Sequence, residues 1–479
     1  MPIKTNYDTI IIGAGLAGLV CGSYLSKAGM KVLLIERHDK PGGYFTSFKR
    51  KGFLFEAAAH SFGNYRAGGL VRSIFSDLGL NDILTIHRAE PSDIFFTPDF
   101  TIAFRNDTEA TITALANIFP DEKNNLKSFF HFLTTADHID LMKLKTKTFQ
   151  SLLQSFFRDN KLINTLGLPV LGNGGLPPSL MHAFNGTKVF TESMIDGGYY
   201  PEGGVQNLSN ALAQIIKQHG GTILYKREVA HITTANNVAS GVRLINDEYL
   251  PAGCVISACD SIQTFTKFLD KTEAGKAMQS VLEHMTPSLS FFILYIGVDQ
   301  PFAGLPPRGV NTWYLPHYDL DKIYSHMQEG ELSKAGMYMI RVSPDSRTIL
   351  AYTNAPFISS AFWKSEKKKI AEDFMNRIEE LVPNLRTHTV FFDAATPATL
   401  FRYTLNYKGA AYGWASTQSQ MFIPELKRVP LVKNCYLAGH WTSLGSGLPS
   451  AFYSGYEVAQ RILRKNKKTS GIPAINNAH

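Results

Sequence analysis

The sequence predicts an α/β fold with more than one domain. Residues 7–12 (YDTIII) have the composition of a buried strand, a glycine-rich turn and a helical stretch follow to residue 28, and residues 31–35 (KVLLI) form a second strand. The chain has 479 residues, 44% hydrophobic and 18% charged, which is roughly two to three times a typical domain. No apolar run reaches the roughly 18 residues of a membrane-spanning helix, so we expect a soluble multi-domain protein.

The turn after the first strand has the spacing of a phosphate-binding loop. It reads Gly-Ala-Gly-Leu-Ala-Gly, and an acid ends the second strand 18 residues after the last glycine. The glycines allow a tight turn, close approach of a pyrophosphate and helix–strand contact, and the acid can accept hydrogen bonds from ribose hydroxyls. The residues assigned to this dinucleotide site are Gly13, Gly15, Leu16, Ala17, Gly18 and Glu36. The alternative is a βαβ unit that binds no nucleotide.

The residues after Glu36 narrow the choice of cofactor. They read Arg-His-Asp-Lys-Pro-Gly-Gly-Tyr, which resembles the E-R-x-x-x-x-G-G pattern of flavoproteins of the glutathione-reductase-like superfamily. The resemblance implies that FAD is the cofactor and that Arg37, Gly42, Gly43 and Tyr44 lie close to it. Taken alone, the same residues are compatible with a plain Pro-Gly-Gly turn between two elements.

Two later segments match the same superfamily. In residues 199–229, paired glycines precede a helix of 3.6-residue periodicity and short strands follow; the resemblance implies that Val229 contacts adenine through its backbone. Residues 434–463 combine a strand, a glycine-rich loop and a helix, and look like the motif that closes over the flavin. Its cofactor-binding residues would be Gly439, His440, Gly447, Leu448 and Pro449. Relatives often carry an acid where this chain has His440.

Together with residues 396–414 (TPATLFRYTLNYKGAAYGW), these segments look like the phytoene desaturase, carotenoid isomerase and retinol saturase family over essentially the whole chain. The resemblance implies a discontinuous Rossmann-type FAD-binding domain from residues 1–90, 196–275 and 425–466. An α+β substrate-binding domain, residues 91–195 and 276–424, would be inserted in it, and residues 467–479 would be a flexible tail. The implied function is FAD-dependent desaturation, saturation or isomerisation of carbon–carbon bonds in an apolar polyene or isoprenoid.

The family chemistry requires few catalytic side chains, because hydride transfer belongs to the flavin. His60 and Arg402 are our catalytic candidates; His60 either donates a proton and shapes the pocket or is a structural histidine. Tyr403, Tyr412 and Trp414 are secondary candidates. The sequence shows no nucleophile triad, and its four scattered cysteines do not have metal-ligand spacing.

The net charge of +8 raises the question of an acidic partner, but no nucleic-acid-binding motif is found, so we expect no nucleic-acid partner. Residues 141–166 predict a basic amphipathic helix that either contacts a membrane surface or packs on the second domain. Its apolar stripe consists of Phe149, Leu152, Leu153, Phe156 and Phe157. A second basic cluster, within residues 461–468, is typical of a solvated helix end. We expect a cytoplasmic protein, peripheral on the inner face of the membrane if this helix binds lipid.

Two other functions compete with polyene oxidoreduction. One is a flavin oxidase for a small polar substrate, of the amine-oxidase or porphyrinogen-oxidase type. The other is a non-enzymatic prenyl- or lipid-binding relative, against which the intact glycine loop and Glu36 argue. The sequence identifies no electron partner.

Overall fold

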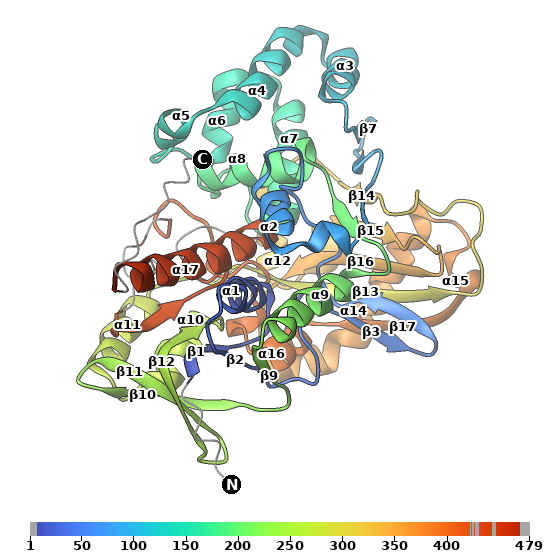
Figure 1. Cartoon of the computed structure of the whole chain (residues 1–479). Coiled ribbons are helices and arrows are strands. Elements are labelled where there is room, and N and C mark those ends of the chain that lie inside the picture. Colours follow the sequence, from blue (N-terminus) through green and yellow to red (C-terminus); the bar gives the residue numbers. More distant parts are fainter. Residues whose placement is uncertain (1–6, 422, 424–425, 427–430, 443–446, 470–479) are drawn as a thin grey trace.

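The computed structural model describes residues 7–469 except 422, 424–425, 427–430 and 443–446. Two seven-stranded sheets and a group of helices make up this part of the chain (Figure 1). The mixture of parallel sheet and helices confirms the predicted α/β class. Among the described residues, no helix is both long and apolar enough to cross a bilayer.

The first sheet has the strand order β10-β11-β12-β1-β2-β9, and β18 pairs with β12. Strands β1, β2, β9, β12 and β18 run parallel to one another, whereas β10 and β11 add an antiparallel extension beside β12. The bounds are β1 (Tyr7–Ile12), β2 (Val32–Ile35), β9 (Thr222–Leu224), β10 (Val229–Ala235), β11 (Val238–Leu244), β12 (Tyr249–Ser257) and β18 (Cys435–Leu437). The last four residues of β1 are buried, as expected of a strand covered on both faces.

Helices cover one face of this sheet. Helix α1 (Leu16–Lys27) contacts both α9 (Val205–Gln218) and α17 (Leu448–Thr469) (Figure 1). An added Cβ at Gly455 of α17 would lie 2.4 Å from the Ala17 carbonyl oxygen, so the two helix backbones meet closely. The opposite face packs against α11 (Glu273–Glu283) and the side chains of Trp414 and Trp441.

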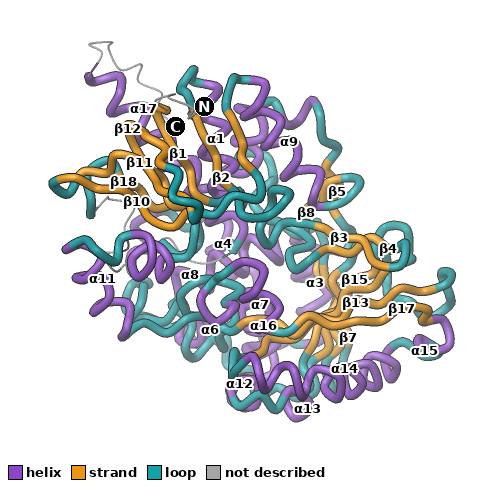
Figure 2. The backbone as a smooth tube through the Cα atoms, turned by 90° about the horizontal axis from the view of Figure 1, so that it is seen from below, coloured by secondary structure: helices purple, strands orange, loops and turns teal. Residues whose placement is uncertain are grey.

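The second sheet has the order β17-β13-β16-β15-β14-β6-β7, and only β14 and β6 are parallel. Helix α14 (Ser360–Leu381) covers one face of it (Figure 2). The opposite face belongs to the largest core cluster, which includes the helices of residues 108–190. The bounds are β6 (Asp93–Phe96), β7 (Thr101–Phe104), β13 (Ser290–Val298), β14 (Asn311–Tyr314), β15 (Tyr338–Val342), β16 (Thr348–Ala355) and β17 (Thr389–Ala395).

Several short elements connect these layers. Two small antiparallel pairs are the hairpin of β3 with β4 and the long-range pair of β5 with β8. Their bounds and those of the remaining short helices are β3 (Ser47–Arg50), β4 (Phe53–Glu56), β5 (Ile86–Arg88), β8 (Tyr199–Pro201), α2 (Leu70–Leu78), α10 (Ser261–Gln263), α12 (Leu320–Gln328), α13 (Leu332–Ala335), α15 (Leu385–His388) and α16 (Pro397–Thr404).

The strands of each sheet come from the segments that the sequence assigns to one domain. The first sheet uses the segments assigned to cofactor binding, and the second uses those assigned to substrate binding. The exact domain division remains a prediction. Helix α17 extends to Thr469, so residues 467–469 of the expected tail are helical; residues 470–479 lie outside the described residues.

The prediction of one lipid-facing helix over residues 141–166 is wrong. The segment forms the end of α5 (His138–Met142), then α6 (Phe149–Phe156) and the start of α7 (Asn160–Gly174). Four residues of the predicted stripe are buried, and Phe156 is partly buried. They pack on α4 (Lys123–Thr135) and α8 (Ala183–Phe190), next to α3 (Thr108–Ile118) (Figure 1). The stripe therefore belongs to the core, as the packed alternative requires.

Candidate functional site

A cavity of about 690 Å³ extends from the glycine loop of the first sheet to the inner face of the second. Nearly all the sequence-predicted cofactor residues line it; the exception is Gly18, which lies behind the loop. The predicted residues on its wall are Gly13, Gly15, Leu16, Ala17, Glu36, Arg37, Gly42, Gly43, Tyr44, Val229, Gly439, His440, Gly447, Leu448 and Pro449. The structure thus brings together residues from four segments distant in sequence.

The glycine loop leaves the start of α1 open toward the cavity. Gly15 is the N-cap of the helix, and no side chain caps the first turn. An added Cβ at Gly15 would meet nothing within 4 Å, whereas one at Gly18 would lie 2.1 Å from the Gly13 carbonyl oxygen. The free amides and positive dipole end of α1 therefore face a space that a phosphate can enter.

Glu36 lies at the end of β2 and is 8% exposed. Its Oε2 accepts a hydrogen bond from the Ala14 backbone N–H at 2.8 Å, and its Oε1 accepts one from the His38 N–H at 2.8 Å. The carboxylate therefore ties the glycine loop to the turn after β2, a role that the sequence did not reveal. Its remaining lone pairs can accept from ribose hydroxyls.

The Pro-Gly-Gly turn packs directly on the glycine loop. The Gly42 N–H donates to the Ala14 carbonyl at 2.8 Å, and an added Cβ at Gly43 would lie 3.3 Å from Gly15 Cα. The Tyr44 hydroxyl is within 3.1 Å of the Gly409 and Ala410 carbonyl oxygens, and burial raises the pKa of Tyr44 to about 12. The turn is thus fixed from both sides.

Residues 438–441 and 447, which precede α17, form another part of the wall. The Gly439 N–H donates to Ser454 Oγ at 2.9 Å, and Pro449 is the second residue of α17, where the missing N–H costs nothing. Burial lowers the pKa of His440 to about 4, so its imidazole is neutral at pH 7. A neutral imidazole can donate one hydrogen bond and accept one, but it cannot supply the negative charge of a carboxylate.

The two catalytic candidates lie in different environments. His60 is 9% exposed, and burial together with the Arg341 charge lowers its pKa to about 3. Arg402 is exposed, and its carbonyl accepts a hydrogen bond from Arg37 Nη2 at 2.8 Å. Both line the cavity. At neutral pH His60 therefore acts as a neutral polar group, and the catalytic assignment of both residues remains a prediction.

The secondary catalytic candidates lie in two different places. Tyr403 and Tyr412 line the cavity, whereas the Trp414 ring packs 5.1 Å from Trp441 in the core of the first sheet. The Tyr412 hydroxyl donates to the Gly172 carbonyl at 2.7 Å. Of these three, only the two tyrosines can therefore contact a bound ligand.

Sequence reasoning missed most of the wall on the side of the second sheet. This wall is largely aromatic and aliphatic, with a few polar side chains. Its residues include Asn173, Val189, Glu192, Phe291, Tyr295, Asn311, Tyr352 and Leu400. The periodicity of a strand or a helix indicates that one face is buried, but not that this face lines a cavity, so the sequence held no signal for these residues.

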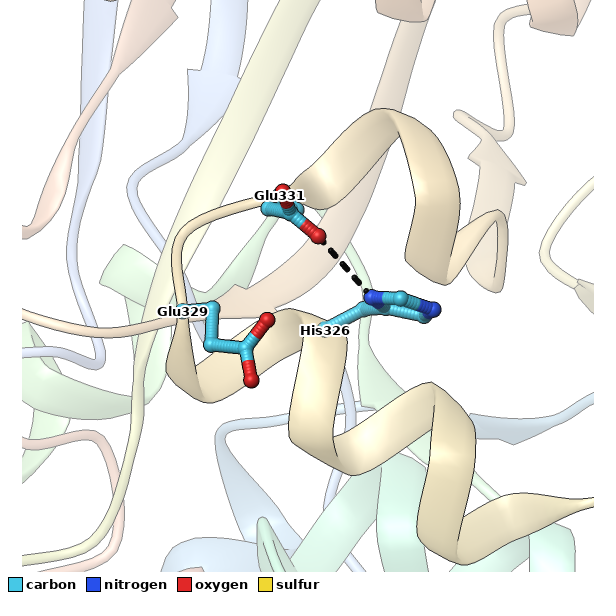
Figure 3. A group of neighbouring side chains, drawn as sticks. All are labelled: His326, Glu329 and Glu331. Atoms are coloured by element: carbon cyan, nitrogen blue, oxygen red, sulfur yellow. Dashed lines mark hydrogen bonds and ion pairs between the residues drawn. The ribbon is translucent and has the colours of Figure 1, made fainter.

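One group of three metal-type ligands lies outside the cavity. His326, Glu329 and Glu331 bring ligand atoms within 4.8 Å of one another near the end of α12 (Figure 3). Glu331 already pairs with His326 at 3.0 Å and with Lys334 at 2.7 Å. The hydrogen bond between His326 and Glu331 and the ion pair of Glu331 with Lys334 hold two of the three side chains together.

A glycine loop that opens the first helix, an acid at the end of the second strand and a long cavity beyond them define a dinucleotide-binding protein. The sequence matches the model of the flavin-containing amine oxidoreductase family over residues 16–463. The chain belongs to this family. It is an FAD-dependent oxidoreductase, and the glycine loop, the open helix start and Glu36 fit the pyrophosphate and ribose of FAD.

Similar proteins support this conclusion. A lycopene-forming phytoene desaturase of Pseudescherichia vulneris is 25% identical over 95% of this chain and 99% of its own length. An all-trans-retinol 13,14-reductase of Danio rerio is 24% identical over 97% and 87%. An oxidoreductase from Methanosarcina mazei shares the fold, with a TM-score of 0.69, 18% identity and coverage of 94% and 99%.

Proposed function

We propose that the protein uses FAD to make, reduce or isomerise carbon–carbon double bonds in an apolar polyene or isoprenoid. The observation that carries the proposal is the cavity, which continues from the dinucleotide site to a wall that includes Phe291, Tyr295, Tyr352 and Leu400. Each CH₂ group removed from water contributes about 0.8 kcal/mol, so a long hydrocarbon chain gains most of its binding energy from such a wall. The relatives named as acting on phytoene and retinol support the same substrate class.

The chain's own residues would bind and orient both molecules. The amides at the start of α1 and Glu36 would hold the pyrophosphate and ribose. The cavity-lining residues Gly439, His440, Gly447, Leu448 and Pro449 would lie against the ring system. FAD supplies acceptance or donation of hydride when bound. The aromatic faces of Phe291, Tyr352 and Tyr412 would exclude water and stabilise positive charge that develops along a polyene.

Glu192 is the cavity residue on which the amine-oxidase alternative depends. It lines the cavity, its side chain is 11% exposed, and its carboxylate could pair with an amine. Burial raises its pKa, and Lys188 already lies 3.9 Å from Glu192 Oε1. The acid therefore has a cation beside it, which disfavours binding of a second one.

The test is anaerobic incubation of the FAD-loaded protein with phytoene, a poly-cis carotenoid, retinol and putrescine, each with the flavin oxidised and reduced. Product separation and the flavin spectrum are read together. We expect a changed polyene and no reaction with putrescine. Bleaching of oxidised flavin by putrescine, with all polyenes unchanged, would refute the proposal in favour of an amine oxidase.

We also propose contact with an anionic membrane surface, but through α5 and not through α6. Ile139 and Met142 are 66% and 40% exposed, and Lys145 and Lys147 beside them are exposed. Each lysine near an anionic surface contributes roughly 1 kcal/mol, which salt screens. A polyene is held in bilayers, so such contact would bring the protein to its substrate.

Co-sedimentation with phosphatidylglycerol and phosphatidylcholine vesicles at low and high salt tests this contact. Ile139→Asp/Met142→Asp should lower pelleting with anionic vesicles. Ile245→Asp is the matched control, because Ile245 is 67% exposed but lies at the end of the β10–β11 extension. Equal pelleting of the double variant and the wild type would exclude α5 as the contact.

A further inference from the structure

One stretch of the cavity wall is polar although it lies among aromatic side chains. His60, Asn173, Asn311 and Tyr352 line the cavity, and we call them the polar cluster. The Tyr352 hydroxyl donates to Asn173 Oδ1 at 3.4 Å, and the Tyr352 ring lies 5.9 Å from the His60 ring. The Asn311 side chain lies beside the His60 imidazole. Four distant segments thus place polar groups at one position.

The amide of Asn311 is held in a fixed orientation. Its Oδ1 accepts from Arg341 Nη1 at 2.9 Å, and its Nδ2 donates to Asp93 Oδ1 at 3.1 Å. The same Asp93 oxygen accepts from Trp313 Nε1 at 2.8 Å. Asp93, Asn311 and Arg341 are direct register partners on three adjacent strands, and all are buried. Hydrogen bonds that hold a side chain in one orientation are typical of a preorganised binding site.

His60 contributes a neutral group. Its Nδ1 lies 3.4 Å from the Ala58 carbonyl oxygen, and the tautomer that donates there leaves Nε2 as an acceptor. Burial and the Arg341 charge oppose a second proton on the ring and hold the pKa of His60 at about 3. Asn173 adds two amide N–H donors, and the Tyr352 oxygen can accept. The polar cluster can therefore both donate to and accept from a ligand.

We propose, on the basis of the proposed polyene function, that the substrate carries a neutral oxygen group, a hydroxyl or a carbonyl, which the polar cluster binds. A pure hydrocarbon placed against these residues would remove their water without replacing the hydrogen bonds, and each unreplaced bond lowers affinity. An alcohol can donate to His60 or Tyr352 and accept from Asn173. Sites built to hydrogen-bond a hydroxyl discriminate strongly against analogues that lack it.

The test compares two ligands that differ only in this group. The FAD-loaded protein is titrated with all-trans-retinol and with the hydrocarbon in which CH₃ replaces its CH₂OH, and quenching of protein fluorescence gives each affinity. A purely apolar cavity would bind the hydrocarbon more tightly, because the hydroxyl costs desolvation. We expect the alcohol to bind at least about fivefold more tightly, since one good hydrogen bond is worth about tenfold.

Variants locate the effect. Tyr352→Phe and His60→Phe should each reduce the preference for the alcohol. Tyr412→Phe is the matched control, because Tyr412 also lines the cavity but its hydroxyl is bonded to the Gly172 carbonyl. The flavin absorbance of each variant shows whether it has folded.

The outcomes separate this inference from the function on which it rests. A wild-type preference for the alcohol below fivefold, or a preference for the hydrocarbon, overturns the inference and leaves polyene chemistry in place. An equal loss of preference in Tyr352→Phe and Tyr412→Phe also overturns it. If neither ligand binds to the FAD-loaded protein, the proposed function itself fails.

Discussion

Replacing Glu36 with glutamine separates two roles of this residue. The carboxylate accepts one backbone N–H on each oxygen, from Ala14 and His38, both at 2.8 Å. Glutamine has the same shape but only one oxygen, so one of the two N–H groups would face an NH₂ group. A hydrogen bond to a charged group contributes about 1.5–3 kcal/mol, and an unsatisfied buried donor adds to the loss. We therefore expect the free energy of unfolding of the FAD-free protein to fall by about 2–4 kcal/mol.

The same substitution should weaken FAD binding by about tenfold or more, because the amide replaces a charged acceptor of ribose hydroxyls. Urea unfolding of the FAD-free protein and fluorescence titration with FAD measure the two effects separately. Glu202→Gln is the control. The Glu202 side chain is 69% exposed and contacts the exposed His87 ring, so the change should stay within about 0.5 kcal/mol.

Each result can refute one part of the reasoning. Unchanged stability of the FAD-free Glu36→Gln protein would refute the role of Glu36 in holding the glycine loop. Unchanged FAD affinity, with lowered stability, would show that the carboxylate serves the loop and not the ribose.

Three further predictions follow from the described contacts. Gly18→Ala should destabilise the FAD-free protein by about 1–3 kcal/mol, because its Cβ would lie 2.1 Å from the Gly13 carbonyl oxygen. Gly15→Ala, whose Cβ would meet nothing within 4 Å, should lower only the affinity for FAD. Equal stabilities of the two variants in urea unfolding would contradict the different roles given to Gly15 and Gly18. His60 has a folded-state pKa of about 3, so below the unfolded value the unfolded chain binds a proton that the folded protein does not. The stability of the wild type relative to His60→Phe, from urea unfolding, should therefore fall by about 1.4 kcal/mol between about pH 7.5 and 5.5, and a rise would refute the neutral state. Phe149→Ala, at a fully buried position, should cost about 3–5 kcal/mol in thermal or urea unfolding; a cost near zero would mean that α6 does not pack as described.

The cofactor half of the site could be predicted because its requirements are local in sequence. Gly13, Gly15 and Gly18 lie within one turn, and the positions of the strand, the helix and Glu36 are set by spacing alone. The close contact of Gly18 with the Gly13 carbonyl is a direct consequence of this spacing. The second role of Glu36 could not be predicted, because the bond to Ala14 depends on how the folded loop presents its N–H groups.

The part of the cavity on the side of the second sheet could not be predicted. Sequence periodicity indicates that one face of a helix or strand is apolar, but not whether lipid, substrate or another element contacts that face. Phe149, Leu152 and Leu153 repeat as a lipid-binding stripe would, yet α4 and α8 cover them. Conversely, Asn311 and Arg341 occupy strand positions at which the alternation predicts core residues. In the structure they are paired, buried polar residues, and Asn311 lines the cavity beside His60. Both outcomes depend on contacts between separate elements, such as the packing of α6 on α4 and α8 and the pairing of β14 with β6. The polar cluster is formed by strand pairing between distant segments, so the sequence alone does not show it. The same pairing holds its side chains in place, and Tyr352→Phe therefore removes one hydroxyl without moving the others. Such small substitutions are the appropriate probes of what the cavity binds.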